Sequence, residues 1–166
     1  SHDEMRTGLD TPRRHFRLGD DDGGQYSIEF DPREIRAGTL PLLRELGFNR
    51  LSMGVQDFDP AVQKAVNRLQ SPELTFAVLG EARALGFRSV NMDLIYGLPL
   101  QTVDSFARTL ASVIAAAPDR LSIFNYAHLP KMFKTQRQID ESQLPGAQTR
   151  LDILQRTNEM LTAAGY

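Results

Sequence analysis

Two carboxylates and one amide stand in this sequence where apolar side chains would be expected. Glu29 lies within the segment YSIEF, Asp93 lies within SVNMDLIY, and Gln56 ends RLSMGVQ. A carboxylate inside a buried strand is unfavourable unless it has a partner. Each carboxylate alone could form a structural ion pair, with Arg50 or Arg68 as the partner. The three groups together favour a polar ligand, whose hydroxyl or amino groups they would bind.

Two further side chains could contribute chemistry. The guanidinium fork of Arg68 could hold a carboxylate with two hydrogen bonds, or it could only interact with the end of a preceding helix. His128 could act as a general acid or base, although a loop hydrogen bond is its more ordinary role. The sequence contains no P-loop, GxSxG or HExxH motif. We therefore predict neither a catalytic residue nor a metal ligand in this chain.

The elements that must position these residues alternate along the sequence. Segments rich in β-branched and aromatic residues predict strands, and capping residues followed by helical spacing predict helices between them. The predicted strands are 26–30, 50–56, 89–96 and 120–126, and the predicted helices are 32–46, 59–68, 71–86, 102–117 and 151–164. This alternation predicts an α/β fold with four parallel strands. The polar residues at the carboxyl ends of the strands should then meet at one mouth.

Composition excludes several classes of function. The chain has 166 residues, a formal net charge of −2 and no cysteine. It therefore cannot form a disulfide, a thiolate zinc site or a cysteine-bound iron–sulfur cluster by itself. Neither the charge nor the hydropathy suggests binding to nucleic acid or to a membrane, and a cytoplasmic location is expected.

The predicted elements divide the chain into two parts. Residues 1–25 form a lead-in: Ser1–His2 is interpreted as a tag remnant, a weakly patterned stretch with some helical character follows, and residues 19–24 form a polar turn. Residues 26–166 form the patterned domain. Four parallel strands with open edges make an incomplete (β/α) barrel, so we expect a fragment that self-associates through those edges. The alternative is a self-contained α/β binding domain.

Four segments carry a family resemblance. They are YSIEFDPREI, LGFNRLSMGVQDFDPAVQKAVNR, NMDLIYGLPLQT and DRLSIFNYAHLP. In this order they resemble the oxygen-independent coproporphyrinogen III oxidases of the radical S-adenosylmethionine (SAM) superfamily, over residues 26–166. SMGVQDF and MDLIYGLPLQT recur in a wider group that includes heme chaperones. A radical SAM heme chaperone is therefore the alternative function.

The resemblance implies the central part of a radical SAM barrel. In that family a CxxxCxxC triplet binds a [4Fe–4S] cluster that chelates SAM, and propionates of coproporphyrinogen III are oxidatively decarboxylated to vinyl groups. The product is protoporphyrinogen IX, an intermediate of heme biosynthesis. This sequence lacks the triplet, so it should not bind the cluster and should be inactive alone.

The resemblance also implies cofactor contacts at matching positions. Glu29 and Ala127 correspond to contacts with one SAM molecule. Gln56, Arg68 and Asp93 correspond to contacts with a second SAM molecule.

Overall fold

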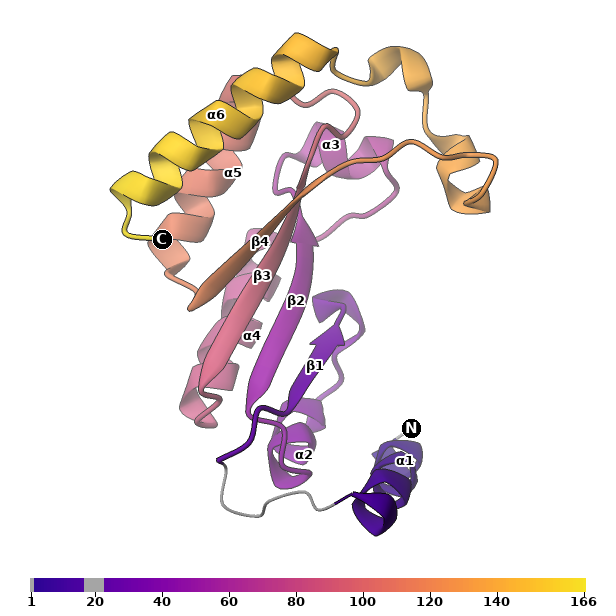
Figure 1. The fold of residues 1–166 in the computed structure, drawn as a ribbon, viewed down its shortest axis with the longest axis vertical. Helices are drawn as coiled ribbons and strands as arrows, with labels where there is room; N and C mark the ends of the chain where they lie inside the picture. The colour runs from indigo at the N-terminus through magenta and orange to yellow at the C-terminus, as the bar shows by residue number, and fades with distance from the viewer. Residues whose placement is uncertain (1, 17–22) are drawn as a thin grey trace.

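The computed structural model describes residues 2–16 and 23–166 and contains one parallel sheet (Figure 1). Its four strands lie in the order β1-β2-β3-β4, with every neighbouring pair parallel, which confirms the predicted α/β fold. The strands are β1 (Ser27–Phe30), β2 (Arg50–Gln56), β3 (Ser89–Tyr96) and β4 (Arg120–Asn125). Ser1 and most of the polar turn expected at residues 19–24 lie outside the described ranges.

Helices alternate with the strands. They are α1 (His2–His15), α2 (Thr39–Glu45), α3 (Pro60–Ala65), α4 (Pro72–Ala84), α5 (Val103–Ala116) and α6 (Ala147–Ala163), with short 3₁₀ turns η1 (Pro32–Glu34), η2 (Lys134–Gln138) and η3 (Glu141–Gln143). Local capping sets several starts: Ser71 accepts a hydrogen bond from the Leu74 N–H, and Thr102 forms a capping box with Ser105. No helix in the described part of the chain is both long and apolar enough to cross a bilayer.

The two faces of the sheet differ in polarity because apolar and polar residues alternate along β2, β3 and β4. The apolar face packs against α2, α4, α5 and α6 and forms the main core. Its central residues include Met53 and Met92, which are paired in register, with Leu110 of α5 and Ile153 of α6 packed in the same cluster. The other face carries the polar residues that alternate with these side chains.

The single helix predicted over residues 32–46 is wrong. Asp31 and Pro32 start only the 3₁₀ turn η1, and Ile35 is already extended. Gly38 then adopts a left-handed conformation (φ 81°), after which α2 begins. Leucines at helical spacing did not reveal this break, because a glycine is compatible with a weak helix as well as with a turn.

The helix predicted at residues 59–68 is shorter than expected. Asp59 caps α3 by accepting hydrogen bonds from the backbone N–H groups of Ala61 and Val62, but α3 ends at Ala65. Asn67 then takes a left-handed conformation (φ 53°), which asparagine tolerates better than most residues. This reversal returns Arg68 towards the sheet instead of leaving it at a helix end.

The lead-in and the region after β4 contain further helical structure. α1 confirms the helical character expected before residue 17, and the guanidinium of Arg6 donates two hydrogen bonds to the Glu45 carboxylate at 2.7 and 2.9 Å. Between β4 and α6 the chain contains only the short turns η2 and η3, and α6 packs against α5.

Candidate functional site

The polar face of the sheet carries a hydrogen-bonded group centred on Asp93. The Asp93 carboxylate accepts hydrogen bonds from the Ser52 hydroxyl (2.9 Å) and the Asn91 amide (2.6 Å). The Asn91 amide also donates to the Ser122 hydroxyl (3.0 Å). Asp93 is 9% exposed, and its partners are these neutral groups rather than the suggested Arg50 or Arg68. The ion-pair interpretation of Asp93 is therefore wrong.

Gly54 forms the floor of the site beside Asp93. It is the register partner of Asp93, and a bulge between Gly54 and Gln56 shifts the pairing of β2 with β3. A Cβ atom on Gly54 would lie 2.9 Å from Gln56 Nε2 and 3.1 Å from Arg68 Nη2. Only glycine leaves room for both side chains here. Gln56 also has a left-handed backbone (φ 68°), a strain that is common at binding sites.

Arg68 comes from the loop after α3 and lies over Gly54. It donates hydrogen bonds to the Gly54 carbonyl through Nη2 and to Asp31 Oδ2 through Nη1, both at 2.8 Å. Burial lowers the pKa of the Arg68 guanidinium, and the nearby Asp31 carboxylate opposes this shift. The Arg68 Nε–H is buried and has no hydrogen-bond partner.

The expected bidentate binding of a ligand carboxylate by Arg68 therefore needs correction. Asp31 and the Gly54 carbonyl each accept a hydrogen bond from one terminal nitrogen, and the Nε–H is the buried donor that has no partner. Arg33, the Arg33 backbone N–H and Arg68 lower the pKa of Asp31 to about 2, Arg33 having the largest effect. The arginine is thus oriented by a carboxylate that stays ionised at neutral pH.

Glu29 lies on the same face but is not buried. Its register partner is Ser52, the residue that donates to Asp93, so Glu29 and Asp93 share the polar face. Glu29 is exposed, so the expectation that it is buried is wrong. The reason is that β1 is an edge strand of the described sheet. Glu29 can meet a ligand without first losing a structural partner.

Ala127 lies far from Glu29 in this sheet. It follows β4, whereas Glu29 is in β1, and β2 and β3 separate these two strands. At a spacing of about 4.8 Å between neighbouring strands, the two edges are roughly 14 Å apart. The Ala127 carbonyl accepts a hydrogen bond from Gln136 Nε2 at 3.0 Å. A SAM molecule that touched both residues would have to span the width of the sheet.

His128 has the role of a loop residue. Its Nδ1 lies 3.1 Å from the Tyr126 hydroxyl, which agrees with the ordinary interpretation of this histidine. In the described residues, no group of three or more His, Cys, Asp or Glu side chains could hold a metal ion.

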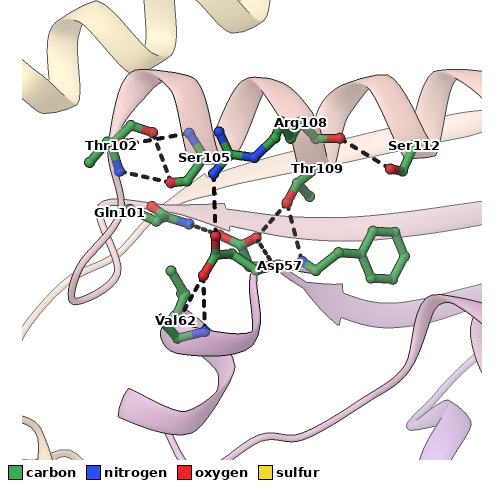
Figure 2. A network of polar contacts seen from close by, with 11 residues as sticks. Asp57, Val62, Gln101, Thr102, Ser105, Arg108, Thr109 and Ser112 are labelled. Atoms are coloured by element: carbon green, nitrogen blue, oxygen red, sulfur yellow. Dashed lines mark hydrogen bonds and ion pairs between the residues drawn. The ribbon is translucent and has the colours of Figure 1, made fainter.

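A second buried carboxylate, Asp57, lies at the carboxyl end of β2 and holds a polar network there (Figure 2). It is 1% exposed and accepts hydrogen bonds from Thr109 Oγ1, Gln101 Nε2 and the Asp59 N–H. Burial raises the pKa of this carboxyl, and these hydrogen bonds oppose the rise. The Gln101 Oε1 accepts from the N–H groups of Gly97 and Leu98. Asp57 therefore ties β2 to α5 and to the turn after β3.

The sequence reasoning missed the polar partners on this face: Ser52, Asn91 and Ser122. The signal was present, because RLSMG, SVNMD and RLSI alternate strictly between polar and apolar residues. Such alternation indicates one buried face and one polar face. We had instead expected parallel strands buried on both faces by apolar side chains.

The donor and acceptor set fits a polar cofactor of the nucleoside type. The Asp93 carboxylate can accept hydrogen bonds from ribose hydroxyls, and the Gln56 amide can both donate and accept. The partnerless Arg68 Nε is a feature that a bound ligand would use. By contrast, the sequence contains no cysteine, so this chain supplies no thiolate to an iron–sulfur cluster.

Comparison with known proteins identifies the family. The profile of the Radical SAM superfamily matches residues 4–113. Oxygen-independent coproporphyrinogen III oxidase of Pseudomonas aeruginosa is 59% identical over 163 residues, which are 98% of this chain and 35% of that protein. The protein of the same name from Escherichia coli K12 is 56% identical over 154 residues, covering 93% of this chain and 33% of the relative. The chain thus spans about a third of the length of these curated relatives.

Solved structures give the same result. Coproporphyrinogen III oxidase (HemN) from Escherichia coli, described as a radical SAM enzyme, matches with a TM-score of 0.95 and 51% identity, over 100% of this chain and 38% of that one. The archaeal Elp3 of Methanocaldococcus infernus matches with a TM-score of 0.66 at 16% identity, over 80% of this chain and 32% of that one, which shows a shared fold alone. This chain belongs to the radical SAM superfamily and is a close homologue of part of oxygen-independent coproporphyrinogen III oxidase.

Proposed function

We propose that this chain forms part of the SAM-binding barrel of an oxygen-independent coproporphyrinogen III oxidase. One observation carries the proposal: the Asp93 carboxylate, the Gln56 amide and the partnerless Nε of Arg68 gather around Gly54 on one face of the sheet. A site with an acceptor, a mixed donor and acceptor, and a cationic donor suits the ribose and amino-acid parts of SAM.

Each residue has a proposed role in binding. Asp93 is held by Ser52 and Asn91, which leaves acceptor capacity on its oxygens for ribose hydroxyls. The Arg68 Nε–H would donate to a carboxylate oxygen of the cofactor. Glu29 and the backbone at Ala127, at opposite edges of the sheet, are proposed contacts of another SAM molecule. When bound in the longer protein, SAM and a [4Fe–4S] cluster would supply the one-electron chemistry of decarboxylation.

The proposed substrate of the longer protein is coproporphyrinogen III, with protoporphyrinogen IX as the product of heme biosynthesis. The relatives at 56–59% identity are oxygen-independent coproporphyrinogen III oxidases, which supports the oxidase over the heme chaperone. This chain has no cysteine, so we propose that it is inactive alone even after iron–sulfur reconstitution.

Titration of the chain with SAM by isothermal calorimetry tests the binding proposal. Asp93→Ala should weaken the affinity at least tenfold, because losing hydrogen bonds to a charged acceptor costs about 1.5–3 kcal/mol. Asp104→Ala is the matched control: this aspartate is exposed in the first turn of α5, and its loss should leave the affinity unchanged. Equal SAM affinity for Asp93→Ala and wild type, or no SAM binding by the wild-type chain, would refute the proposal.

Two further features belong to the same proposal. β1 and β4 are the edge strands of the described sheet, and unprotected edges favour pairing with a second copy, so the isolated chain should self-associate. The longer protein is proposed to work in the cytoplasm, because the thiolates that hold an iron–sulfur cluster need a reducing compartment.

A further inference from the structure

The polar face of the sheet has a cavity below the Asp93 group. It lies at the amino ends of the strands, which are the lower ends of β2 and β3 in Figure 1, and its volume is about 170 Å³. The polar residues that line it are two arginines, four serines and an asparagine: Arg50, Arg120, Ser27, Ser52, Ser89, Ser122 and Asn91.

The strand register brings the two arginines to one place. Arg50 of β2 pairs with Ser89 of β3, and Arg120 of β4 pairs with Asn91 of β3. The two arginines therefore flank the same strand on the same face, from strands about 10 Å apart. Both side chains line the cavity, so two positive charges border it.

No acidic side chain forms an ion pair with either arginine in the described part of the chain. The lining residues include no Asp or Glu, and neither guanidinium takes part in an ion pair or hydrogen bond in residues 2–16 and 23–166. The neighbouring Asp119 carboxylate accepts a hydrogen bond from the Val90 N–H at 2.8 Å. Two neighbouring cations that lack ion-pair partners repel each other, and an anion between them would relieve the repulsion.

A row of hydrogen-bonded side chains separates this cavity from the Asp93 site. Asn91 Nδ2 shares its two N–H donors among three acceptors, the hydroxyls of Ser52 (2.8 Å) and Ser122 (3.0 Å) and the Asp93 carboxylate (2.6 Å). Ser52 in turn donates to Asp93. The polar face therefore has two levels of opposite charge preference: a carboxylate level above the row and a guanidinium level below it.

We propose that Arg50 and Arg120 form a binding site for a small carboxylate. A guanidinium fork matches the planar carboxylate group with two parallel hydrogen bonds, and serine hydroxyls can supply further donors. The volume accommodates a short carboxylic acid but not a nucleoside. The site lacks a helix N-terminus, the feature that commonly cradles phosphate, so a carboxylate is the better fit. The inference does not depend on SAM binding, since it uses other residues.

Titration of the full chain with sodium propionate, followed by NMR of the arginine Nε–Hε resonances, tests the site. The resonances of Arg50 and Arg120 should shift and saturate. Arg50→Gln and Arg120→Gln should each raise the Kd for propionate at least tenfold. Arg156→Gln is the matched control, because Arg156 is exposed on α6 and pairs only with Glu159, and it should bind propionate like the wild type.

Further variants distinguish a guanidinium site from diffuse positive charge and from a phosphate site. Arg50→Lys and Arg120→Lys keep the charge but lose the fork, so they should bind propionate more weakly than wild type and more tightly than the glutamine variants. SAM affinity should be retained in Arg120→Gln. Absence of saturable shifts, or equal weakening in Arg156→Gln, would overturn the proposal. Tighter binding of inorganic phosphate than of propionate would overturn the assignment to carboxylates.

Discussion

Replacing Asp57 by asparagine tests how the mouth of the sheet is held together. The substitution keeps the shape of the side chain but turns one acceptor oxygen into an NH₂ donor. One carboxylate oxygen accepts from Thr109 and the Asp59 N–H, and the other accepts from Gln101 (Figure 2). Either orientation of an asparagine amide therefore sets a donor against a donor.

Gln101 cannot relieve this conflict by rotating its amide. Its Oε1 already accepts from two backbone N–H groups, those of Gly97 and Leu98, which would lose their partner. A lost hydrogen bond to a charged group costs about 1.5–3 kcal/mol, and the displaced donor stays buried. Removing the charge recovers part of the burial penalty that raises the Asp57 pKa. We expect a net loss of about 2 kcal/mol in the free energy of unfolding.

Urea unfolding at pH 7, followed by far-UV circular dichroism, measures this loss. Asp59→Asn makes the same chemical change two positions away. Since asparagine caps a helix as well as aspartate does, this control should lose less than about 0.5 kcal/mol. If Asp57→Asn costs no more than Asp59→Asn, the argument that Asp57 joins β2 to α5 is refuted.

Two other substitutions probe the site around Arg68 and Gly54. The folded-state pKa of Asp31 is lowered to about 2, so its charged form stabilises the fold above the ordinary value of 3.8, and this contribution is lost as the pH falls from 3.8 towards 2. Asp31→Asn should remove this acid-dependent loss of stability, which is below about 1 kcal/mol for a partly exposed group. Urea unfolding from pH 2 to 5 measures it. If the free energy of unfolding of Asp31→Asn depends on pH as that of the wild type does, the assignment is contradicted. Gly54→Ala should displace Arg68 and lower SAM affinity, measured by calorimetry, at least tenfold. The free energy of unfolding should change by less than about 2 kcal/mol. Gly80→Ala is the control, because no atom lies within 4 Å of the added Cβ. It should leave SAM affinity unchanged and stabilise α4 by up to about 1 kcal/mol. Equal SAM affinity in Gly54→Ala and Gly80→Ala would rule out the role of Gly54.

Local patterns in the sequence were sufficient to predict the parallel sheet. β2 and β3 begin and end where predicted, and β1 and β4 differ by one residue, because β-branched and aromatic segments between turns have few other structures available. Caps predicted the starts of α3, α4 and α5 for a similar reason: a cap is a contact between residues close in sequence. The break in the helix predicted over 32–46 was missed, because the conformation of Gly38 depends on where the chain must turn.

The position of each candidate residue on a strand could be predicted, but its partners could not. Glu29, Gln56 and Asp93 follow from strand position and alternation. By contrast, burial of Arg68 depends on a left-handed turn at Asn67 and on the missing Cβ of Gly54, two residues in different elements.

The sequence by itself determined the strands, most of the helix starts and the family, because short-range patterns and characteristic motifs carry this information. Only the tertiary structure decided that Asp93 bonds to neutral side chains, that Glu29 is exposed and that Arg50 and Arg120 face one cavity. The physical reason is the parallel register. It sets residues about forty positions apart side by side, and their charge and burial then depend on neighbours that no local pattern specifies.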